Sequence, residues 1–119
     1  MLEQGRHDEA EELTRVSEAA TAPDDVASLV GWRRTRALLL VSRGDPEDAA
    51  RLVHEARSLA ARSDSLMLLG EAALAAATVF AKSHRVEAAR AEARRAEELF
   101  ASKGMASSAA RARALSASL

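Results

Sequence analysis

An internal repeat is the feature that most constrains the fold of this 119-residue chain. A small residue, a polar stretch, an acid and an alanine occur together at Gly5–Ala10, Gly44–Ala49 and Ser83–Ala88. Each copy begins 39 residues after the one before. Repeats of about this length are typical of stacked supersecondary units, each of which buries its apolar face only against its neighbours. We therefore expect a ramped stack of such units.

The units are expected to be helical. Apolar residues recur at helical spacing, for example at Ala49, Val53 and Ala56, and no stretch alternates with the period of two that a half-buried strand needs. Turn signals separate the runs: Asp45-Pro46 caps the start of one helix, and Gly104 can end another in a left-handed conformation. Together these signals predict helices over 7–21, 25–43, 46–61, 65–82, 85–102 and 105–117. Because the connections are short, consecutive helices should be antiparallel.

These residues resemble the tetratricopeptide repeat (TPR) family. The resemblance rests on Gly44 and the acidic turn that follows it, on Ala49 and Ala56 of the next helix, and on Ala37 of the preceding helix. Small residues at such positions let two helices approach closely. The resemblance implies an all-α fold, an antiparallel helical-hairpin solenoid of five to six helices. It divides the single domain into a partial repeat (1–23), two repeats (24–62 and 63–103) and a C-terminal capping helix (104–119).

Longer repeats of this kind are similar to the C-terminal superhelical regions of large bacterial ATP-dependent transcription regulators. The stretch Ala96–Gly104, followed by Ala109–Arg113, looks like the terminal cap of such arrays. Leu2–Gly5 has the pattern of the tail of a missing partner helix. We therefore expect the chain to be the end piece of a longer array in a cytoplasmic regulatory protein.

Composition argues against catalysis. The chain has no Cys, which removes thiolate metal sites and a thiol nucleophile, and its His residues are not spaced for metal binding. The glycines are isolated, and no serine lies in a Gly-x-Ser-x-Gly pattern. We expect no enzyme, no metal and no cofactor. No apolar run is long enough to span a membrane, and a formal net charge of -1 gives no strong attraction for nucleic acid or anionic lipid.

A basic group in the fifth expected helix invites a nucleic-acid interpretation. Its members are Arg90, Arg94 and Arg95. Glutamates lie three or four residues from each of them, so the pattern predicts ion pairs within the helix. No aromatic residue is interleaved for base stacking. Nucleic acid is therefore an unlikely partner.

The predicted binding site is a concave groove formed by the first helix of each repeat. Its expected lining is apolar with one cationic edge and suits an amphipathic helix or an extended peptide: Arg34, Leu38, Val41, Ala73, Ala77 and Phe80. The TPR resemblance places Arg34 where some modules grip a peptide's C-terminal carboxylate, whereas Leu38 is apolar where those modules use Asn. The alternative is that the same residues form plain core, with the C-terminal helix folded over them.

The sequence thus predicts a non-catalytic interaction module of a larger bacterial regulatory or signalling protein, with a protein or peptide as partner. Two alternatives remain open: a ligand-sensing or DNA-associated segment of a transcription regulator, and a structural oligomerisation block. Because a short Ala-rich stack with a ragged end leaves apolar surface uncovered, a homodimer through the N-terminal end is also expected.

Overall fold

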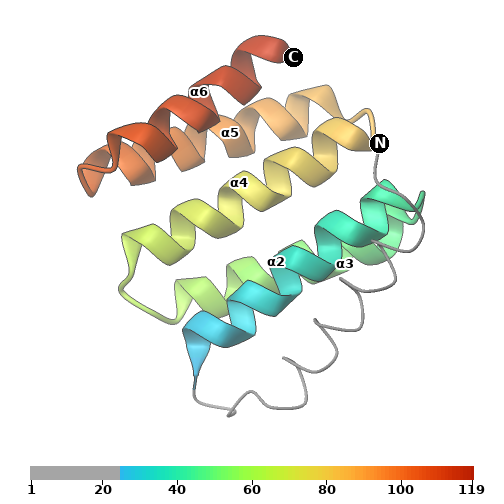
Figure 1. Ribbon diagram of the computed structural model, residues 1–119, viewed down its shortest axis with the longest axis horizontal. Helices are drawn as coiled ribbons and strands as arrows, with labels where there is room; N and C mark the ends of the chain where they lie inside the picture. The colour runs from blue at the N-terminus through green and yellow to red at the C-terminus, as the bar shows by residue number, and fades with distance from the viewer. Residues whose placement is uncertain (1–24) are drawn as a thin grey trace.

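The computed structural model describes residues 25–119, and these residues form five α-helices and no strand (Figure 1). The helices are α2 (Val26–Ser42), α3 (Pro46–Ala61), α4 (Leu66–Lys82), α5 (Val86–Ser102) and α6 (Ala106–Ser118). The all-α prediction is confirmed, and each expected helix end in this part of the chain lies within one residue of its observed position. The helix expected over 7–21, the partial repeat 1–23 and the N-terminal dimer surface lie outside the described residues.

The helices form two layers. In Figure 1, α2, α4 and α6 lie nearer the viewer and run side by side, whereas α3 and α5 lie behind them and run the opposite way. We call these the front layer and the back layer. Helix α4 is central because it packs against all four other helices. The backbones of α2 and α6, and those of α3 and α5, do not approach each other closely, so the α2–α3 pair and the α5–α6 pair pack mainly against α4.

The structural repeat is 40 residues long. Helices α2, α4 and α6 begin at 26, 66 and 106, and α3 and α5 begin at 46 and 86. The buried residues Ala49 and Ala89 are equivalent in this register. The expected 39-residue period is wrong. It aligned Gly44 with Ser83, whereas the residue structurally equivalent to Gly44 is His84. A one-residue error matters, since each residue turns a helix by about 100°.

Three helices end in the same turn. The N–H of Asp45 donates to the carbonyl of Leu40 (2.9 Å) and the N–H of Gly44 to that of Val41 (3.2 Å), the two bonds of a Schellman motif. The same pair of bonds ends α4 and α5, with His84 and Gly104 in the place of Gly44. All three residues have positive φ: +85°, +63° and +77° in chain order. The left-handed end expected at Gly104 is confirmed, and His84 is the member that must adopt this conformation with a side chain.

Three helices begin with a side-chain cap, and one of these is the cap expected at Asp45. The side chains of Asp25, Asp45 and Ser65 accept hydrogen bonds from backbone N–H groups of the first turns of α2, α3 and α4. The backbone N–H and the hydroxyl of Ser28 hold the pKa of Asp25 below its ordinary value. These caps satisfy N–H groups that have no partner within the helix.

Alanine forms much of the core. Alanines account for more than half of the buried apolar residues, which lets the helix backbones approach closely. Phe100 of α5 is the largest fully buried side chain, at 1% exposure. It fits against Gly70 of α4, where an added Cβ would lie only 2.7 Å from the ring atom Cε1. The close approach of α4 and α5 therefore depends on a glycine at this position.

Candidate functional site

A pocket of about 180 Å³ opens on the face of the front layer, and we call it the front pocket. Helix α4 provides one stripe of its lining, from Glu71 to Thr78, while α2 and α6 flank it and Phe100 of α5 contributes at its base. Its lining residues are Arg34, Leu38, Glu71, Leu74, Ala75, Thr78, Phe100, Ser108 and Arg111. The pocket therefore gathers side chains from four helices.

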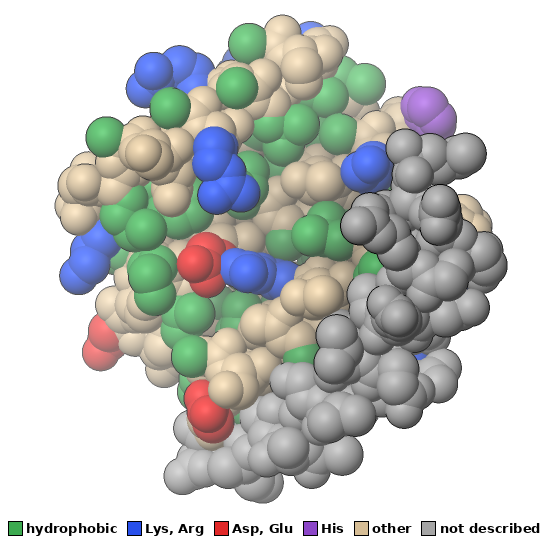
Figure 2. Space-filling view, in the orientation of Figure 1, with side chains coloured by type: hydrophobic (Ala, Val, Ile, Leu, Met, Phe, Trp, Pro, Cys, Tyr) green, Lys and Arg blue, Asp and Glu red, His purple; other side chains and the backbone are tan. Residues whose placement is uncertain are grey.

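The front pocket contains more basic than acidic side chains. Arg34 Nη1 lies 2.7 Å from Glu71 Oε2, and both side chains are partly exposed. Figure 2 shows an acidic and a basic side chain touching near the middle of this face, with hydrophobic side chains around them. Arg111, from α6, is exposed and has no ion-pair partner in the part of the chain that the structure describes. The pocket thus holds two guanidinium groups but one carboxylate, which leaves it with a net positive charge.

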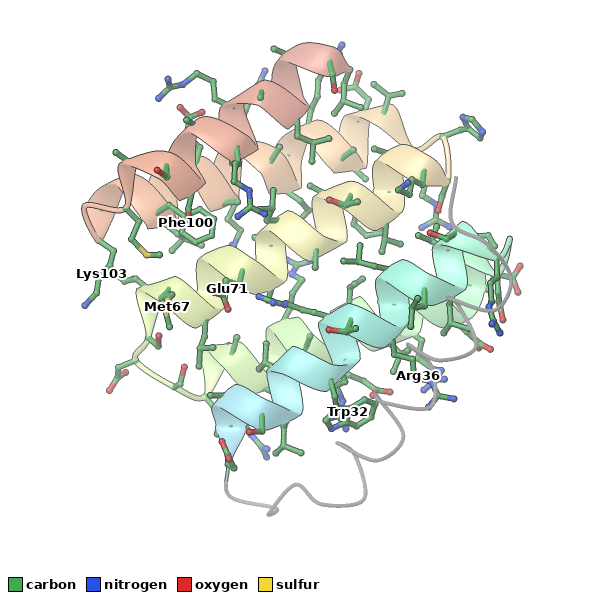
Figure 3. All side chains as sticks on the ribbon, viewed as in Figure 1. Trp32, Arg36, Met67, Glu71, Phe100 and Lys103 are labelled. Atoms are coloured by element: carbon green, nitrogen blue, oxygen red, sulfur yellow. The ribbon has the colours of Figure 1, made fainter. Side chains whose placement is uncertain are left out.

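Apolar surface adjoins these charges. Leu38 is 36% exposed and Met67 39% exposed, the two front-layer members of the exposed large hydrophobic residues. Met67 precedes Glu71 by one helical turn, and both side chains stand on the same side of α4 (Figure 3). The front face therefore combines apolar side chains with an excess of basic groups.

The six residues predicted to line one groove do not come together. Arg34 and Leu38 line the front pocket, as expected. The remaining small and branched members, Val41, Ala73 and Ala77, are buried and offer almost no surface to a partner. Phe80 borders a different pocket, where the guanidinium carbon of Arg85 lies 5.9 Å from the centre of its ring.

The register of the repeat explains this difference. With a 40-residue period, the counterparts of Arg34 and Leu38 are Leu74 and Thr78, and both line the front pocket. The 39-residue period instead predicted Ala73 and Ala77 as the counterparts of Arg34 and Leu38. Each lies one residue earlier, which places it about 100° around α4, toward the core.

Two functional candidates were missed by the sequence reasoning. Glu71 is the sole acidic residue in α4, an otherwise apolar helix, and this isolation was a usable signal. Arg111 lies in α6, which was interpreted only as a cap. In the structure, Ser108 and Arg111 of α6 form part of the lining of the front pocket. Helix α6 therefore borders this pocket and does not fill it.

The front layer as a whole is basic. Its helices contain six basic residues and one acid, whereas α3 and α5 contain more acidic than basic residues. Two of the front-layer arginines reach the back layer: Arg33 Nε lies 3.0 Å from Glu55, and Arg113 Nε lies 2.9 Å from Glu97. These ion pairs between the layers neutralise part of the excess positive charge of the front layer, but they do not neutralise Arg111.

Comparisons with protein-family models, with curated proteins and with solved structures find no match to this chain. Within residues 25–119, no three His, Asp or Glu side chains gather as a metal site would require. No helix in the same range has the length and apolarity needed to cross a bilayer. The candidate site must therefore be interpreted from its own geometry.

Proposed function

We propose that the chain is a non-catalytic interaction module that binds an acidic segment of a partner protein in the front pocket. The observation that carries this proposal is Arg111, which has no ion pair among residues 25–119 and lines a pocket that also holds Arg34 and the exposed Leu38. A carboxylate on the partner complements this charge, and an apolar side chain next to it complements the leucine.

The architecture belongs to the same proposal. Helices that begin every 20 residues, alternate in direction and meet through small residues such as Ala49 and Ala56 are compatible with a TPR-like helical-hairpin solenoid. We propose that this solenoid is part of a larger cytoplasmic bacterial regulatory or signalling protein. In that setting the front layer is the natural recognition face, because it exposes side chains from three parallel helices.

Binding is expected to rearrange one ion pair. A partner carboxylate pairs with Arg111 and competes with Glu71 for the guanidinium of Arg34. The existing pair is partly exposed, and such pairs contribute only about 0–1 kcal/mol, so exchanging one carboxylate for another costs little. Contact with Leu38 adds apolar burial to the charge recognition.

The proposal is tested with random 12-residue peptides displayed on phage and selected against the whole chain. Selected peptides should be enriched in Asp or Glu next to an apolar residue. One selected peptide, synthesised with a fluorescent label, is then titrated by fluorescence anisotropy against Leu38→Glu and Arg111→Ala. Each variant should weaken binding about tenfold or more, the loss expected for one apolar or charge-assisted contact.

Two control variants match these changes. Val86→Glu introduces the same charge at a residue that is 38% exposed, against 36% for Leu38. Arg94→Ala removes an exposed arginine that lines no part of the front pocket. The proposal is wrong if the selection yields no acidic preference, or if the controls weaken binding as much as the pocket variants.

A further inference from the structure

A second pocket lies on the opposite side of α4, and we call it the back pocket. It has a volume of about 260 Å³ and lies where α3 and α5 diverge, with Leu69 and Ala73 of α4 contributing to its lining. The other lining residues are His54, Arg57, Ser58 and Ala61 of α3 and Arg95 of α5. No acidic side chain is among them.

The back pocket is positively charged because Glu92 pairs with Arg57 on α3 and leaves Arg95 without a carboxylate partner among residues 25–119. The expected pair of Glu92 with Arg95 does not form; Glu92 Oε1 instead lies 2.9 Å from Arg57 Nη1 on α3. The side chain of Glu92 is only 12% exposed, so it neutralises Arg57 from a largely buried position. Arg95 is left exposed and without an ion pair within residues 25–119. The expectation of a fully compensated helix face is therefore wrong at Arg95, and the expected pair of Arg94 with Glu98 is also absent from the ion pairs of residues 25–119.

The lining polar groups are suited to an oxyanion. Arg57 and Arg95 carry several N–H donors each, and Arg57 uses one nitrogen in its contact with Glu92. Ser58 adds a hydroxyl donor, and His54 adds a ring N–H in either tautomer. Guanidinium groups match the geometry of phosphate oxygens, with which they form charge-assisted hydrogen bonds.

We propose that the back pocket binds the phosphate group of a small phosphate monoester. The volume favours a small ligand, because sites for drug-sized molecules occupy about 300–1,000 Å³. The partly exposed side chain of Leu69 gives the lining an apolar part, against which a short organic substituent of the phosphate can pack. This site is separate from the front pocket, so its occupancy does not depend on the peptide-binding proposal.

The test uses glycerol 3-phosphate as the probe and glycerol as its uncharged control, titrated into the ¹⁵N-labelled whole chain and followed by NMR. Saturable shifts should centre on residues 54–58 and on Arg95, and glycerol should cause none. Arg95→Ala should weaken binding about tenfold, whereas Arg94→Ala, the neighbouring exposed arginine outside the pocket, should change it less than about twofold. Arg111→Ala in the front pocket should have no effect.

Three outcomes overturn the proposal. The first is the absence of saturable shifts. The second is an equal loss in Arg94→Ala and Arg95→Ala, which indicates general attraction of anions. The third is binding of a phosphoserine peptide without binding of glycerol 3-phosphate, which indicates a phosphorylated protein segment as the ligand. Circular dichroism checks that each variant is folded, and Arg95→Gln provides a second substitution at the same position.

Discussion

Gly70 and Gly31 should respond in opposite ways to the same substitution. Both lie inside helices, where alanine is intrinsically better than glycine by about 1 kcal/mol. A Cβ at Gly31 meets no atom within 4 Å among residues 25–119, apart from its own helical turn, so Gly31→Ala should stabilise the protein by about 0.5–1 kcal/mol. A Cβ at Gly70 would lie 2.7, 2.9 and 3.0 Å from three atoms of the Phe100 ring.

The cost at Gly70 follows from the packing of Phe100. The ring is 1% exposed and packs in a cluster with four buried alanines from α4, α5 and α6, so displacing it toward the front pocket would break these contacts. Overpacking of this kind costs about 1–3 kcal/mol, and close contact with three ring atoms places this substitution in the upper part of that range. After the gain in helix propensity, Gly70→Ala should destabilise the protein by about 1–2 kcal/mol.

Urea unfolding followed by circular dichroism at 222 nm measures both effects. The midpoint should rise for Gly31→Ala and fall for Gly70→Ala, with the slope m unchanged. Combining Gly70→Ala with Phe100→Leu should cost less than the two separate losses added together, because the smaller side chain relieves the contact. The packing argument is refuted if Gly70→Ala is as stable as the unaltered chain, or if the two substitutions are additive.

Further predictions concern the turns, one cap and the front pocket. His84→Gly should stabilise the protein by about 1 kcal/mol, because glycine adopts positive φ without strain, and Gly44→Ala should destabilise it by a similar amount; urea midpoints measure both. Ser65→Ala should cost about 1 kcal/mol through loss of the α4 cap, and an unchanged midpoint would contradict this assignment. Glu71→Gln should release Arg34 and raise the affinity of an acidic peptide several-fold by fluorescence anisotropy; weaker binding would argue against the competition proposed above.

Local signals explain why the helix ends were predictable. Asp25, Asp45 and Ser65 cap the helices that follow them, and Gly104 ends α5, because each of these interactions spans only a few residues. The sequence alone therefore contained the information needed. His84 was harder to assign, since residues other than glycine seldom adopt positive φ, although histidine does so more often than most.

The pockets were less predictable because they depend on register and on contacts between helices. The rotation of α4 decides whether Leu74 or Ala73 faces the front pocket, and a one-residue error in the period exchanges them. Likewise, spacing along α5 suggests that Glu92 pairs with Arg95, although a nearby guanidinium on α3 takes that carboxylate. Neither the rotation nor the competing partner can be read from one helix alone.

The ion pairs between helices differ in how readily they can be exchanged. Arg34 and Glu71 are both about one-third exposed, so water and a partner carboxylate can compete for the arginine. Glu92 is much more buried than Glu71, and removing the partner of a buried charge is costly. We therefore expect the Arg34–Glu71 pair to open when the front pocket is occupied, while Glu92 continues to hold Arg57 in the lining of the back pocket. Because α4 lies between the two pockets, a ligand in one can leave the other intact as long as this helix keeps its register.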